Sequence, residues 1–180
     1  MGSNVFLVAA YEYDGAGLAA NGEWAAAASR YELALDLARR TRALLTLEAE
    51  LLAGLARSQL GLGELERARA TAEEAVRTAI ARGTPVFEVD AQLALAEARL
   101  AVDGEATRPE IEAALRRCSE LIEQTGARLY TPQVHERRAA LADLAGDAAE
   151  AGRERREAHR RYTEMGATGH AERIAREQGP

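Results

Sequence analysis

The chain has 180 residues, of which 47% are hydrophobic and only 4% aromatic, and its formal net charge is −6. This length suffices for one domain with a sizeable core, and a core rich in alanine but poor in aromatics favours packed helices over a β-sandwich. The negative net charge argues against general nucleic-acid binding, which needs a positive field along a groove.

The N-terminal segment and the cysteine content bear on the compartment. The longest apolar start, residues 5–10, is too short for a membrane span or a secretory signal. Cys118 is the only cysteine, so the chain forms no internal disulfide, which fits a reducing compartment. We therefore expect a cytoplasmic protein that does not engage membranes.

Glycines divide the chain at regular intervals. Four of them precede an acidic residue and are 41 or 42 residues apart: Gly22, Gly63, Gly104 and Gly146. A second series with a similar period lies between them: Gly83, Gly126 and Gly166. Glycine just past a helix end accepts the left-handed conformation that closes the last turn. Two interleaved series with one period predict one helical hairpin per repeat.

Between the breaks, apolar residues follow helical spacing, as in Leu65, Ala68, Ala72 and Ala75. The predicted first helices of the hairpins cover 5–21, 43–62, 86–102 and 131–145. The predicted second helices cover 23–41, 64–82, 108–125 and 147–165, and a capping helix covers 168–178. We expect one all-α domain over 5–180, with repeats at 5–41, 43–82, 86–125 and 131–165.

The second helices resemble the second half of a tetratricopeptide repeat. The residues that carry the resemblance are Gly22-Glu23-Trp24 with Ala27 and Tyr31, Gly63-Glu64-Leu65 with Ala68 and Ala72, and Gly146-Asp147-Ala148 with Ala151 and Ala158. The usual period is about 34 residues, so these helices are longer. The resemblance implies a right-handed α-solenoid. The segment 123–178 is similar to the C-terminal repeats of large bacterial signalling ATPases, cyclases and transcriptional activators.

Two parts of the chain depart from the family pattern. A third position carries the bulky residue that the motif places where the two helices of a hairpin cross. Gln59 is polar where the motif often has an aromatic residue. Residues 11–15, Tyr-Glu-Tyr-Asp-Gly, fit an ideal first helix poorly, so the first hairpin is expected either to be frayed or to have packed on an upstream domain. Trp24 is the lone tryptophan and is expected to plug the hairpin crossing in the core.

No motif in the chain indicates catalysis, a metal or a cofactor. Gly15 and Gly17 lack the preceding strand and the glycine spacing of a phosphate loop. The three histidines have no i, i+4 pair and the chain has no CxxC, so no metal site is predicted. Cys118 lies on an apolar stripe and is interpreted as a core residue. We expect a protein that is not an enzyme.

The expected function is binding in the concave groove of the solenoid, which the first helices line by analogy with the family. Its candidate polar residues are Glu12, Glu50, Arg57, Gln92, Arg99, Gln133, Glu136 and Asp143. The groove positions also include small residues: Ala16, Ala53, Ala91, Ala94, Ala98 and Ala140. The chain contains no lysine, so the lysine clamp with which some relatives hold a peptide carboxylate is missing. The groove suits a helix or a basic segment, although its polar residues equally fit a solvated helix face.

These observations favour a protein–protein interaction module, the sensor or scaffold part of a larger bacterial signalling protein, with a protein or peptide partner. Two alternatives remain open at this level. Long-helix repeats can hold a small inducer molecule within the superhelix, and solenoid ends or faces can pair into a homodimer.

Overall fold

The computed structural model describes residues 2–177, and within this range it contains helices and no strand. The chain forms four hairpins of α-helices: α1 (Gly2–Ala20) with α2 (Trp24–Thr41), α3 (Glu48–Gly61) with α4 (Leu65–Arg82), α5 (Pro85–Val102) with α6 (Arg108–Thr125), and α7 (Thr131–Leu144) with α8 (Ala148–Glu164). Helix α9 (Thr168–Glu177) packs on α8. The all-α solenoid expected from the sequence is confirmed.

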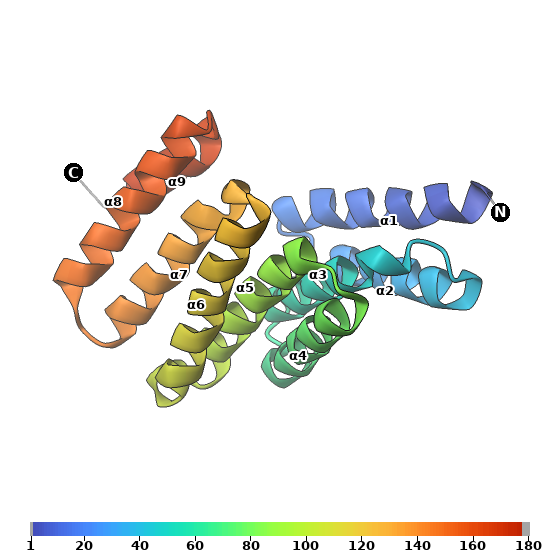
Figure 1. The fold of residues 1–180 in the computed structure, drawn as a ribbon, viewed down its shortest axis with the longest axis horizontal. Helices are drawn as coiled ribbons and strands as arrows, with labels where there is room; N and C mark the ends of the chain where they lie inside the picture. The colour runs from blue at the N-terminus through green and yellow to red at the C-terminus, as the bar shows by residue number, and fades with distance from the viewer. Residues whose placement is uncertain (1, 178–180) are drawn as a thin grey trace.

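The hairpins follow one another along the long axis of the molecule, from α1 and α2 at one end to α8 and α9 at the other (Figure 1). Each first helix after α1 packs on the second helix of the preceding hairpin, and α3 also packs on α5. The capping helix was expected over 168–178, and residue 178 lies outside the described residues.

The helix ends lie where the glycine series predicted them. All seven glycines of the two series have positive φ, between 56° and 78°. The first repeat has no glycine at its matching position, and there Arg42 takes the left-handed conformation instead, with φ 54°. Leu44 is also left-handed, and the 3-10 turn η1 (Leu45–Leu47) follows it. The second hairpin therefore begins its α-helix at Glu48, later than the predicted start at residue 43.

Two further short turns connect the later helices. The segment that joins α5 to α6 forms the 3-10 turn η2 (Gly104–Thr107), which leads directly into α6. The turn η3 (Arg128–Tyr130) precedes α7. Pro85 and Pro132 lie in the first turns of α5 and α7, where a helix tolerates the missing N–H.

The expectation of a frayed first hairpin is wrong. Helix α1 runs without a break through residues 11–15, Val8 is fully buried, and Gly15 lies against the ring of Tyr31 from α2. A side chain at position 15 would press on that ring, so the glycine that weakened the helical pattern is what lets α1 approach α2.

The apolar core is a chain of clusters along the stack rather than one central mass. A first cluster joins α1, α2 and α3 around Val8, Tyr31 and Leu51. Alanines of α3, α4 and α5 pack closely in a second cluster, and branched residues of α5, α6 and α7 form a third. Cys118 is fully buried in the third cluster, as predicted, and burial raises the pKa of its thiol to about 12.

Trp24 is not part of the fully buried core in which it was expected. Its indole is half-buried and lies against the backbone of Gly61, near the end of α3. Gln59, two residues earlier, is buried, and its side-chain oxygen has no hydrogen-bond partner in the described residues. The polar residue at this motif position thus faces the interior, where an aromatic residue would have packed.

The packing of Tyr31 between Gly15 and Gly54 gives a first prediction. A Cβ added at Gly54 would lie 2.4 Å from Cζ of Tyr31, whose ring is only 6% exposed and has little room to move. We expect Gly54→Ala to lower the free energy of unfolding by about 1–3 kcal/mol through overpacking. Gly17→Ala is the control, because nothing lies within 4 Å of its Cβ position. In an α-helix that change should raise stability by about 0.5–1 kcal/mol, and urea denaturation of both variants measures the contrast.

Candidate binding site

The first helices of the hairpins, α1, α3, α5 and α7, form one side of the stack, which we call the first-helix face. Contacts between consecutive members hold this face together: α1 with α3, α3 with α5, and α5 with α7. Side chains that repeat every seven residues on α5 return to this side, because seven residues make almost two helical turns. This places Asp90 and Glu97 of α5 opposite Arg57 of α3.

A half-buried network of charges crosses the middle of this face. Arg57 donates to Oδ1 of Asp90 at 2.8 Å and to Oε2 of Glu97 at 3.1 Å. Arg137 of α7 donates to Oε1 of Glu97 at 2.8 Å. Burial disfavours the charge of Glu97, but the two guanidinium groups outweigh it and lower the pKa of this carboxyl. The network ties three hairpins together through side chains that are each less than a third exposed.

At the N-terminal end of the face, carboxylates lie near one another without arginines to neutralise them. Glu12 of α1 and Glu50 of α3 make no hydrogen bond or ion pair in the described part of the chain. Burial raises the pKa of Glu50 to about 7, and the nearby charges of Glu12 and Asp90 add to the effect. Burial also raises the pKa of Glu12. We call Glu12 and Glu50 the acidic end of the face.

Two phenols lie within the electrostatic range of the acidic end. Burial raises the pKa of Tyr31 to about 12, and the charge of Glu12 is the next contribution. Burial, followed by the charges of Asp90 and Glu50, raises the pKa of Tyr130 from the turn η3. Both phenols stay protonated at neutral pH, so they add aromatic surface and O–H groups beside the carboxylates without adding charge.

At the C-terminal end of the face, the charges are satisfied within the protein. Glu136 of α7 accepts a hydrogen bond from the hydroxyl of Tyr162 at 2.5 Å and pairs with Arg173 of α9 at 2.6 Å. Asp143 pairs with Arg155 of α8. A depression of about 250 Å³ is lined here by the charged side chains of Glu136, Arg137, Asp143, Arg155 and Arg173, together with Ala140. Glu136 therefore ties α7 to α8 and to the capping helix.

The structure brings some of the predicted site residues together and separates others. Glu12, Glu50 and Arg57 lie on the first-helix face, as do Glu136 and Asp143 at its far end. Gln133 is half-buried on α7, and no hydrogen bond of its side chain occurs in the described residues. Gln92 and Arg99 do not belong to this group. Gln92 lines a cavity between α4, α5 and α6, beside Glu88 and Arg117, and Arg99 follows it by seven residues on the same side of α5.

Sequence reasoning missed four residues of this face: Asp90, Glu97, Arg137 and Tyr130. The seven-residue spacing of Asp90 and Glu97 was a usable signal, because it marks one side of α5. The alanines expected in the groove, Ala53, Ala91, Ala94 and Ala98, are fully buried between helices. They allow the first helices to approach, and they are not available to a ligand. Ala16 is exposed and Ala140 half-buried.

Two of the three histidines, His135 and His170, make structural side-chain contacts. Nδ1 of His135 lies 2.5 Å from Oε2 of Glu154, and the ring of His170 stacks on Tyr162 with centroids 4.8 Å apart. Within residues 2–177, no group of three or more histidine, cysteine, aspartate and glutamate side chains has the arrangement of a metal site. No helix in this range combines the length and apolar character needed to cross a bilayer.

Comparison with known proteins identifies the fold. No family model and no curated protein sequence matches the chain. Among solved structures, it is similar to aspartyl phosphate phosphatase F from Bacillus subtilis, with a TM-score of 0.73 and 10% sequence identity. The match covers 96% of this chain and 44% of that chain, so this chain spans less than half the length of that structure. At this identity the likeness shows a tetratricopeptide-like helical repeat fold and nothing of its activity.

The raised pKa of Glu50 gives a second prediction. Between about pH 4.5 and pH 7, the folded state holds the Glu50 proton that the unfolded state has lost, so stability falls as the pH rises through this window. Glu50→Gln carries no such charge. We expect it to match the wild type near pH 4.5 and to exceed it by about 1 kcal/mol above pH 7, after allowance for the exposed part of the side chain.

Chemical denaturation at pH 4.5, 6 and 8 measures this difference. The matched control is Glu110→Gln, which removes a carboxylate from an exposed position on α6 with no ion pair in the described residues. A stability gain for Glu50→Gln that is the same at every pH would show that burial does not suppress the charge of this carboxyl.

Proposed function

We propose that residues 5–180 act as a single protein-interaction domain whose first-helix face binds a basic segment of a partner protein. The observation that carries the proposal is the unequal charge balance of this face. Its middle and C-terminal end satisfy their charges internally, whereas Glu12 and Glu50 lack cationic partners. An arginine or lysine from a partner would supply the missing charge in a partly desolvated setting, where ion pairs are stronger than in water.

The fold supports binding rather than catalysis as the role. Solenoids of helical hairpins present extended surfaces to protein segments, and the half-buried Tyr130 lies within electrostatic range of the acidic end. Aromatic side chains of this kind pack against the alkyl parts of arginine and lysine. The resemblance of segment 123–178 to bacterial signalling proteins supports a regulatory setting for this interaction.

Phage-displayed random 12-residue peptides, selected on the immobilised protein, test the proposal. We expect the enriched peptides to carry at least two arginines or lysines. The variant with both Glu12→Gln and Glu50→Gln should bind them about tenfold more weakly, while Glu110→Gln should bind them as the wild type does. Enrichment of neutral or acidic peptides, or equal binding by the double variant, would refute the acidic end as the site.

The same site should bind more tightly as the pH rises from 6 to 8. Glu50, with a pKa of about 7, is largely protonated at the lower pH and ionised at the higher one. A cationic partner favours the ionised form, so binding at pH 7 releases protons. Titration calorimetry in two buffers of different ionisation enthalpy detects this release, and Glu50→Gln should abolish it.

A second proposal is self-association through the outer side of α1. The exposed positions Phe6, Ala10, Tyr13, Gly17 and Ala20 follow alternating steps of four and three residues. This is the spacing of a coiled-coil seam, and none of these positions is charged. Phe6 is 76% exposed and Tyr13 is 74% exposed. A second copy of the chain presents the same uncharged seam, so two α1 helices can pair about a two-fold axis.

The size of this seam predicts a weak dimer. Two aromatic side chains expose roughly 300 Å² per copy, so their burial supplies roughly 600 Å², about half of what a specific interface needs. Light scattering should therefore show a mass that rises with concentration. The variant with Phe6→Ser and Tyr13→Ser should remain monomeric. Ile80→Ser, which removes an apolar side chain that is 59% exposed on α4, should leave the dimer intact. An unchanged mass for the double variant would reject the seam.

A further inference from the structure

The third and fourth hairpins enclose a cavity on the side of α7 away from the first-helix face. Its volume is about 400 Å³, within the range of small-molecule sites. Arginines from three elements line it: Arg128 before α7, Arg138 on α7 and Arg161 on α8. Arg161 pairs with Glu157 of its own helix at 2.8 Å, so the available positive charge comes from Arg128 and Arg138. Ile122 and Val134, both buried, form its apolar part. A protein with a net charge of −6 thus holds a locally positive, partly apolar cavity.

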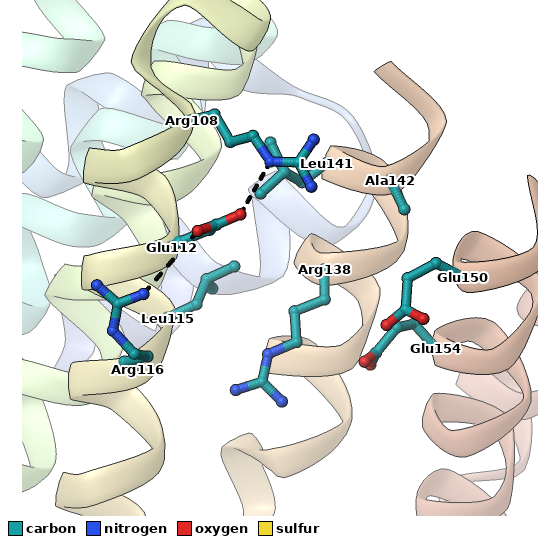
Figure 2. A pocket seen from close by; sticks show the side chains of 9 residues that line it. All are labelled: Arg108, Glu112, Leu115, Arg116, Arg138, Leu141, Ala142, Glu150 and Glu154. Carbon is teal, nitrogen blue, oxygen red and sulfur yellow. Dashed lines mark hydrogen bonds and ion pairs between the residues drawn. The ribbon is translucent and has the colours of Figure 1, made fainter. Parts of the chain in front are cut away.

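The two successive arginines of α7 point to different sides. Arg137 reaches Glu97 on the first-helix face, whereas Arg138 donates to the hydroxyl of Ser119 on α6 at 3.0 Å. Arg138 makes no ion pair with a carboxylate in the described residues. Figure 2 shows its side chain extending from α7 toward α6, with the guanidinium turned away from Glu150 and Glu154.

The three carboxylates that line the adjoining cavity with Arg138 already have partners. Figure 2 draws the adjoining cavity of about 280 Å³, which Arg138 also lines. There Glu112 pairs with Arg108 at 2.9 Å, and Glu154 lies 2.5 Å from His135. Glu150 pairs with Arg153. The charge of Arg138 is therefore left for a group that enters from outside.

The segment that carries Arg128 is held in place at the mouth of the cavity. Gly126 has φ 75°, the amide of Arg128 donates to the carbonyl of Gly126 at 2.7 Å, and the amide of Ala127 donates to the hydroxyl of Thr125. Arg128 is exposed and makes no ion pair in the described residues. The first turn of α7, which also lines the cavity, adds the partial positive charge of a helix N-terminus.

We propose that this cavity binds a small amphipathic anion. A phosphate or carboxylate group pairs with Arg128 and Arg138, and an apolar body packs on Ile122 and Val134. Arginine suits this role because its planar guanidinium matches both anions with paired hydrogen bonds. The exposed Glu123 on the rim opposes highly charged ligands, which favours a single anionic group. The site is separate from the acidic end, so either proposal can fail alone.

An NMR titration of the ¹⁵N-labelled protein tests the site with three probes of one shape. Phenyl phosphate and phenylacetate carry the anion and the apolar ring, and benzyl alcohol carries the ring alone. We expect at least one anion to shift the amide signals of Ser119, Gly126 and Val134, and benzyl alcohol to bind at least tenfold more weakly. The tighter anion identifies the preferred group. Absence of these shifts with both anions, or equal binding of benzyl alcohol, would overturn the proposal.

Variants connect the binding to the arginines. Arg128→Gln and Arg138→Gln should each weaken binding of the preferred anion about tenfold. Arg77→Gln should not, because it makes the same charge change at an exposed position on α4. Since Arg138 also bonds to Ser119, circular dichroism checks that its variant is folded. Arg128 is exposed, so its replacement should not disturb the fold. Arg128→Gln therefore tests the site even if Arg138→Gln is unfolded. Equal weakening by Arg77→Gln would show only a general attraction of anions and would overturn the site.

Discussion

The close packing of Tyr31 against two glycines is the constraint on which the rest of the N-terminal half depends. The ring projects from α2 and touches the backbone of α1 at Gly15 and of α3 at Gly54. Glu12 lies three residues before the first glycine and Glu50 four residues before the second, so each is about one helical turn away. The contact that joins three helices therefore also carries two carboxylates to one place.

Bringing carboxylates together on the first-helix face is electrostatically unfavourable, and this repulsion is relieved in different ways along the face. In the middle, Arg57 and Arg137 neutralise Asp90 and Glu97, and the ion pairs also connect three hairpins. At the N-terminal end no guanidinium reaches Glu50, and its raised pKa is the response. A face whose charges were all satisfied would offer little to a partner. The unsatisfied end makes cation binding and proton release two parts of one equilibrium.

The candidate site was only partly accessible from the sequence. Family analogy pointed to the first helices, but on α5 it chose Gln92 and Arg99, which lie on another side of the helix than Asp90 and Glu97. A helix advances about 100° per residue, so an error of two residues moves a side chain to another side of the helix. In the sequence, no charged residue of α5 is a better candidate for this face than another. Only the ion pairs of Asp90 with Arg57 and of Glu97 with Arg137 show which side of α5 faces α3 and α7.

The sequence by itself determined the helical hairpins and most of their limits, because glycine spacing and apolar periodicity are local properties of the chain. The left-handed glycines confirm this. Arg42, which stands where the first repeat lacks a glycine, is also left-handed and follows the end of α2. Tertiary structure alone decided which alanines are buried, that Trp24 packs on the next hairpin, and that Arg138 faces a cavity. These features depend on the angle and distance between helices, which arise from side chains far apart in the sequence and leave no periodic signal in it.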